Sequence, residues 1–137
     1  MGVRRQSREV ALQVLFQAEF SSDPESEFPF EKSLEVFRSS FDFSRDVWSY
    51  AEVILQGIFA NKNQIDTLID STSTNWRLAR MPLVDANILR IAVFELQFGA
   101  EAPPKVVINE ALEIARKYGG TESSQFINGI LDQLIPK

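Results

Sequence analysis

Hydrophobic residues recur every three or four positions along almost the whole of this chain, a spacing that matches one face of an α-helix. The clearest case runs from Val84 to Leu96, where hydrophobic residues leave almost no wholly polar face. A helix of that kind is expected to be surrounded by other helices. No segment shows the strict alternation of a strand, and no long internal repeat competes. The sequence therefore predicts an all-α domain.

Prolines, glycines and polar interruptions mark the ends of the predicted helices. Pro82 and Pro104 suit first helical turns, Gly119-Gly120 ends a helix, and the polar residues 61–63 interrupt a long apolar stripe. Gly129 is expected to let another helix approach closely. Proline, serine and threonine favour loops over 20–30 and 71–75. The predicted helices span about 3–19, 31–39, 45–60, 64–70, 81–98, 103–118 and 121–134.

The composition excludes most kinds of catalytic and metal site. The 137 residues include no cysteine and no histidine, which removes disulfides, thiol nucleophiles and zinc-finger ligands. The acidic residues lack the spacing of a calcium loop, and no glycine-rich phosphate loop is present. We therefore expect neither an enzyme nor a bound cofactor or metal. No apolar run reaches the roughly 20 residues that cross a bilayer, so we expect a cytoplasmic protein without membrane contact.

A basic cluster opens an otherwise acidic chain. The formal net charge is −5, yet Arg4, Arg5 and Arg8 fall within the first eight residues with no acid among them. On a helix, Arg5, Arg8 and Phe16 would share one side with Leu12. Such a strip suits single-stranded RNA, whose phosphates bind cations and whose bases stack on aromatic rings. The arginines could equally form a solvated segment, and Phe16 could equally belong to the core.

Four segments of the chain resemble the NusB family: RRQSREVALQVLF (4–16), VDANILRIAVFEL (84–96), APPKVVINEALEIARKYG (102–119) and SSQFINGILD (123–132). The resemblance implies one domain over 1–137, with about seven helices in two packed subdomains, about 1–72 and 73–137. It also implies a transcription antitermination factor that binds the boxA sequence of nascent ribosomal-RNA leaders together with NusE, a ribosomal protein of the small subunit. The complex would act on RNA polymerase and support ribosomal-RNA maturation.

The resemblance also assigns site residues. Glu122 is an awkward member, because a carboxylate repels phosphate and would instead accept a hydrogen bond from a base amino group. Phe126 lies at the edge of an apolar stripe, so both burial and RNA contact remain open. The implied RNA-binding residues are Arg4, Arg5, Arg8, Phe16, Lys117, Glu122, Ser123, Gln125 and Phe126.

For the partner protein, the resemblance points to Asp85, whose carboxylate would pair with a basic group of NusE and steer association. Trp76, Arg77 and Arg80 would frame the same surface. The alternatives are that Asp85 and Glu95 are exposed at a subdomain edge without a role, and that Trp76 is core.

Two other functions and one oligomeric state stay open. A purely protein-binding helical scaffold would have the same fold. A detached NusB-like domain of a ribosomal-RNA methyltransferase is disfavoured by the length of the chain and by its lack of a catalytic cysteine. A homodimer that hides the RNA face is also possible on this sequence.

Overall fold

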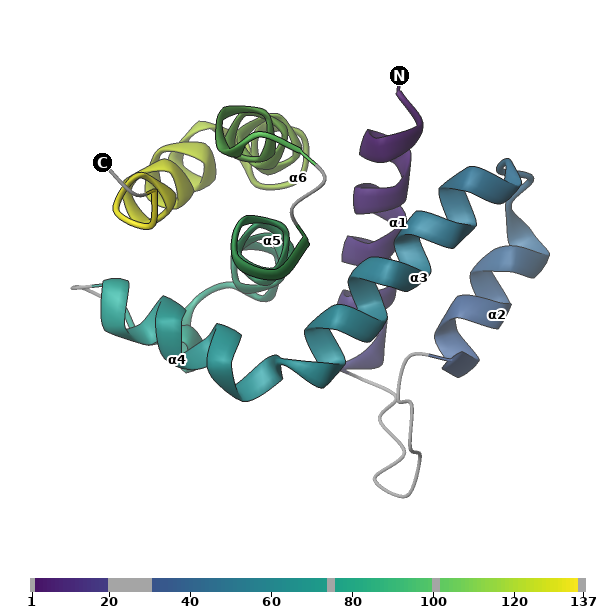
Figure 1. Ribbon diagram of the computed structural model, residues 1–137, viewed down its shortest axis with the longest axis horizontal. Helices are drawn as coiled ribbons and strands as arrows, with labels where there is room; N and C mark the ends of the chain where they lie inside the picture. The colour runs from purple at the N-terminus through teal and green to yellow at the C-terminus, as the bar shows by residue number, and fades with distance from the viewer. Residues whose placement is uncertain (1, 20–30, 74–75, 100–101, 136–137) are drawn as a thin grey trace. The chain divides into compact units, whose positions relative to one another are not determined.

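The computed structural model describes residues 2–19, 31–73, 76–99 and 102–135 (Figure 1). These residues form α-helices and no strand, so the predicted all-α class is confirmed. The α-helices are α1 (Val3–Ala18), α2 (Glu31–Ser40), α3 (Arg45–Ala60), α4 (Lys62–Thr72), α5 (Leu83–Phe94) and α6 (Pro104–Asp132). Two short elements join them, the 3-10 helix η1 (Leu78–Arg80) and the π-helix η2 (Glu95–Gly99).

Two compact units make up the chain, Met1–Ala60 and Asn61–Lys137. In the first unit α1 packs against α3 and α2. The contact between α1 and α3 is made by apolar side chains with almost no exposed surface, such as Val14 and Ile54. Within it the Ser7 hydroxyl is buried and donates a hydrogen bond of 2.8 Å to the carbonyl oxygen of Val47. This bond holds the start of α1 on α3.

The second unit is built around α5, which lies between α4 and α6 (Figure 1). Leu89 and Val93 of α5 are fully buried, as are Ile127 and Leu131 of α6. This agrees with the nearly unbroken apolar pattern of residues 84–96, because such a helix has neighbours on several sides. The Arg90 guanidinium adds a polar tie, donating to the carboxylate of Asp66 on α4 at 2.9 and 3.3 Å.

The predicted helix boundaries agree closely with the structure. Asn61 separates α3 from α4, Pro82 precedes α5, and Pro103 precedes α6. The helix α6 is interrupted at Gly120, whose φ of 86° and ψ of −173° are not helical. When α6 is counted as two helical segments, the described residues form seven α-helices, the number that the sequence predicts.

Four details differ from the sequence-based expectations. The helix predicted to end near Phe98 ends in the π-helix Glu95–Gly99. The helix α4 extends to Thr72, which lies within the predicted loop. The two units divide at Asn61 rather than near residue 72, because Ile65 and Ile69 of α4 pack in the second unit. The expected close approach at Gly129 is wrong, since a Cβ there would meet nothing within 4 Å. The predicted loop 20–30 lies outside the described residues.

Among the described residues, none of the helices has both the length and the hydrophobicity needed to cross a membrane.

Candidate RNA and partner interfaces

The arginines of α1 differ in how far they reach the surface. Arg4 is exposed, Arg5 is half-buried, and Arg8 is only 4% exposed. Leu12, on the same side of the helix, is also buried, so the strip that the sequence predicts is not continuously open. Phe16 at its far end is 40% exposed, which removes the core alternative for this ring. Of the three arginines and Phe16, the parts that reach the surface are therefore Arg4, part of Arg5 and the Phe16 ring.

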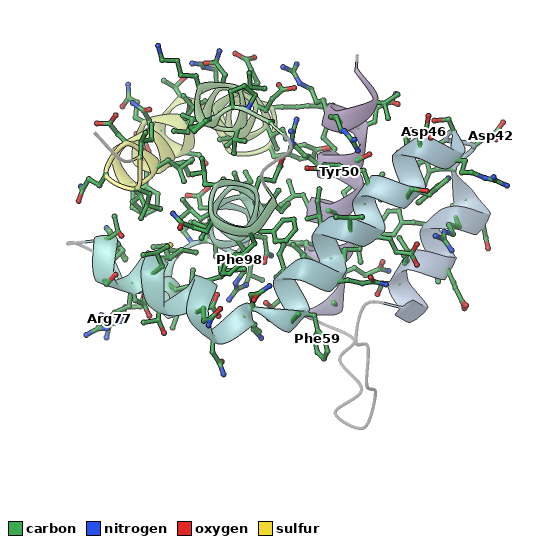
Figure 2. The ribbon with its side chains drawn as sticks, viewed as in Figure 1. Asp42, Asp46, Tyr50, Phe59, Arg77 and Phe98 are labelled. Atoms are coloured by element: carbon green, nitrogen blue, oxygen red, sulfur yellow. The ribbon has the colours of Figure 1, made fainter. Side chains whose placement is uncertain are left out.

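A buried tyrosine supports the most exposed of these arginines. The guanidinium carbon of Arg4 lies 3.8 Å from the ring centre of Tyr50, a residue of α3 that Figure 2 labels. Tyr50 itself is 4% exposed. A cation over an aromatic face at this distance is stabilised by the ring quadrupole. No local sequence pattern predicts this contact, because it depends on how α1 packs against α3.

The first turn of α1 concentrates positive charge. It contains Arg4 and Arg5 and no acidic residue. The N-terminal end of a helix also carries the positive end of the helix dipole, so cations here raise the local potential instead of neutralising it. Such a potential attracts anions, phosphate among them.

The second group of predicted RNA-binding residues surrounds the break in α6 at Gly120. Lys117, Glu122 and Gln125 are exposed, and Phe126 is half-buried. Ser123 differs from them, since it is 7% exposed and its hydroxyl donates a hydrogen bond to Asp85. Ser123 is therefore inside the unit, where it contacts α5, and is not an open RNA-facing residue as the resemblance implied.

A hollow of about 400 Å³ in the second unit gathers most of the predicted partner residues. Trp76 is 52% exposed at this hollow, so it is not core. Arg80 and Asp85 line the same hollow, and so does Phe126 from α6. The apolar lining is completed by Met81 and Pro82, which the sequence had suggested only as a helix start. The hollow thus joins residues assigned to the partner protein with one assigned to RNA.

The segment that carries Trp76 is anchored to α4. The Asp70 carboxylate accepts a hydrogen bond of 2.6 Å from the backbone N–H of Leu78, and Ser73 donates one of 2.6 Å to the carbonyl oxygen of Trp76. Arg77 faces a different hollow, which it shares with Asp70 and Ser71. Figure 2 shows Arg77 projecting outward beside α4. Of the four predicted partner residues, Arg77 alone does not line the Trp76 hollow.

Two acidic residues depart from the surface roles considered for them. Asp85 is 7% exposed and Glu95 is 3% exposed, so neither sits openly at an edge as the alternative reading had it. Asp85 accepts the hydrogen bond from Ser123. A carboxylate held in this way has less freedom to meet a partner's basic group than a surface carboxylate has.

In the described part of the chain, no three acidic side chains come together in a way that would hold a metal ion. The site therefore offers hydrogen-bonding groups, cations and aromatic rings for binding. Nothing in its described geometry activates a nucleophile.

Comparison with known proteins assigns the family. Residues 5–136 match the NusB family. The chain is 47% identical over 132 residues to the transcription antitermination protein NusB of Bdellovibrio bacteriovorus, covering 96% of this chain and 93% of that protein. Its fold matches a crystal form of NusB from T. maritima with a TM-score of 0.80 at 35% identity, over 96% of this chain and 89% of that one.

A further solved structure is a crystal structure of the antitermination factors NusB and NusE in complex with double-stranded RNA. The match has a TM-score of 0.82 at 25% identity and covers 98% of this chain and 96% of the matched one. Sequence and fold thus give the same answer over nearly the full length of the chain, which belongs to the NusB family of transcription antitermination factors.

Proposed function

We propose that this protein is an adaptor that acts by binding. It joins boxA RNA of ribosomal-RNA leaders to NusE within the antitermination complex of RNA polymerase. In this role it supports ribosomal-RNA maturation in the cytoplasm. The observation that carries the proposal is the Trp76 hollow, where predicted partner residues and Phe126 meet. A solved structure of NusB with NusE and double-stranded RNA, similar to this chain over 98% of its length, supports NusE and RNA as the two kinds of ligand.

The hollow suits a protein partner. An exposed tryptophan beside Met81 and Pro82 offers apolar surface, and Arg80 provides a polar rim. Buried aromatic and arginine side chains carry much of the energy of protein interfaces, with polar groups around them. We therefore place the NusE contact here, with Trp76 as its centre.

RNA binding is supported by the start of α1. Arg4 and Arg5 lie in the helix's first turn, and Phe16 exposes its ring three turns further on. Phosphates would meet the arginines, and a splayed base would stack on Phe16. Since the arginine cluster of α1 exposes only Arg4 and part of Arg5, the affinity of the free protein for RNA should be modest and should rise when NusE is bound.

The test is a titration of the protein with a boxA RNA and with a scrambled RNA of the same composition, each with and without NusE. The expected result is preferential binding of boxA RNA that strengthens in the presence of NusE. Equal binding of both RNAs under all conditions would contradict the proposal.

Two observations favour a second function, a protein-binding scaffold without RNA contact. The net charge of −5 and the burial of Arg8 both reduce the positive surface available to phosphate. Tight binding of NusE with no binding of either RNA would establish this alternative.

A further inference from the structure

A single buried hydrogen bond joins α5 to the break in α6. The Ser123 hydroxyl donates to the Oδ1 oxygen of Asp85, and both residues are 7% exposed. Hydrogen bonds to a charged group in a buried site are stronger than those at a surface. This one fixes the first turn of α6 after Gly120 relative to α5.

The backbone around this bond has little room. A Cβ on Gly119 would lie 2.6 Å from the Oγ of Ser123 and 3.5 Å from the Oδ1 of Asp85. The next residue, Gly120, interrupts the helix with a φ of 86°. The absence of a side chain at Gly119 thus lets the Ser123 hydroxyl reach the carboxylate, because a larger residue at position 119 would clash with Ser123.

The bond lies between the Trp76 hollow and the residues around the α6 break that the family resemblance assigns to RNA. On one side, Asp85 lines the hollow that contains Trp76 and Arg80. On the other side, Ser123 is flanked by the exposed Glu122 and Gln125. Phe126, three residues beyond Ser123 on the same helix, returns to the hollow.

We propose that Asp85 is a positioning residue, which acts through Ser123 to couple occupancy of the Trp76 hollow by the protein partner to the RNA affinity of residues 117–126. The inference rests on the proposed function. A partner seated in the hollow would restrain Phe126 and Asp85, and the hydrogen bond would pass that restraint to the turn after Gly120. By thermodynamic reciprocity, RNA bound at the turn would raise partner affinity by the same factor.

The experiment compares four variants of the full chain. Ser123→Ala removes the donor and Asp85→Ala removes the acceptor. Asp85→Asn keeps an oxygen that can accept the bond but removes the negative charge. Ser124→Ala is the matched control, because Ser124 is 4% exposed and adjacent, so the variant deletes an equally buried hydroxyl without touching this bond. Dissociation constants for fluorescent boxA RNA are measured with and without NusE, and their ratio gives the coupling.

In the unaltered protein the ratio should exceed one. Ser123→Ala and Asp85→Ala should each weaken RNA binding in the presence of NusE by about tenfold, the fold-change that matches loss of one hydrogen bond to a charged group. Their ratios should fall towards one, whereas Ser124→Ala should keep the full coupling and Asp85→Asn, whose neutral oxygen still accepts a weaker bond, should keep part of it. A wild-type ratio in Ser123→Ala overturns the inference, and so does a ratio of one in the unaltered protein.

Two further results separate this inference from its alternatives. If Asp85 acted as a charged contact with NusE, Asp85→Asn would slow association with NusE while Ser123→Ala would not, and that pattern would refute the positioning role. If the unaltered protein bound no boxA RNA at all, the proposed function would fail and the inference with it.

Hydrogen exchange provides a readout that does not depend on RNA. In Ser123→Ala, backbone amides of residues 119–126 should exchange faster than in Ser124→Ala, while those of α5 remain protected. Unchanged exchange in this segment would show that the bond does not hold the turn. Melting temperatures of all four variants show whether a loss of affinity comes from unfolding. Ser123→Ala, which deletes one oxygen atom, is expected to perturb the fold least.

Discussion

Truncation of Phe16 tests the RNA surface most directly, because the expected losses of affinity and of stability differ. The ring is 40% exposed, so one part of it already packs on the protein and the remainder can stack on a base. Stacking of a base on an aromatic ring is worth about 1–3 kcal/mol. For a ring that offers only part of its surface we expect the lower part of that range, about 1–2 kcal/mol, or roughly 5- to 30-fold weaker binding of boxA RNA in Phe16→Ala.

The same substitution should leave the fold intact. Removing a fully buried phenylalanine costs about 3–5 kcal/mol, and the exposure of Phe16 reduces this to at most about 2–3 kcal/mol. Phe41→Ala is the matched control, since Phe41 is 46% exposed in the same unit, stacks on Phe37 and Phe43, and is not among the predicted RNA residues. RNA affinity is measured by fluorescence anisotropy over a series of salt concentrations, and stability by thermal melting. Equal RNA affinity in both variants would refute the stacking role, and so would a Phe16→Ala variant whose whole loss follows from unfolding.

Four further outcomes are expected. Arg5→Ala should lower the slope of log affinity for single-stranded RNA against log salt by about 0.7, because one phosphate contact is lost, and an unchanged slope would remove Arg5 from the interface. Asp85→Lys should destabilise the protein by at least about 2 kcal/mol, because it places a charged ammonium group at a buried position, where the Asp85 side chain is 7% exposed. A wild-type melting temperature of this variant would contradict the burial of Asp85. Asp66→Ala should lower the free energy of unfolding by about 1–3 kcal/mol, because it removes both hydrogen bonds that Arg90 donates to Asp66. Urea unfolding measures this loss, and Glu113→Ala, which breaks the exposed ion pair with Arg116, is the control that should cost little. EDTA should change neither melting nor RNA binding, and a loss of either would reveal a metal.

Features with a local cause were predicted well from the sequence. Pro82 and Pro103 precede helices, and the α6 break falls at Gly120, because each of these residues restricts or frees its own backbone. The division between α3 and α4 at Asn61 was visible because polar residues there interrupt the apolar stripe. None of these inferences required knowledge of what the helix packs against.

Features that depend on packing were not predictable in this way. Arg8 and Asp85 are charged and were expected at the surface, yet both are buried. Helical spacing shows which residues share a face, but not which of two adjoining faces meets another helix. The Ser123 partner of Asp85 lies 38 residues away in sequence, so no local pattern contains it. The π-helix Glu95–Gly99 was not predictable either, because its apolar pattern is the same as that of an ordinary α-helix end.

The positions of the two tryptophans provide an optical label for each unit. The chain has two tryptophans, one on either side of the division at Asn61. Trp48 is half-buried beside Phe43, and its indole N–H donates to the Phe43 carbonyl oxygen at 3.1 Å, whereas Trp76 is 52% exposed at the hollow. Emission from Trp48 should therefore lie at shorter wavelength and resist quenching by iodide, and emission from Trp76 should lie at longer wavelength and be quenched readily. A Trp76→Phe variant would report on the first unit alone and a Trp48→Phe variant on the second, so the unfolding of each half can be followed without any added fluorophore.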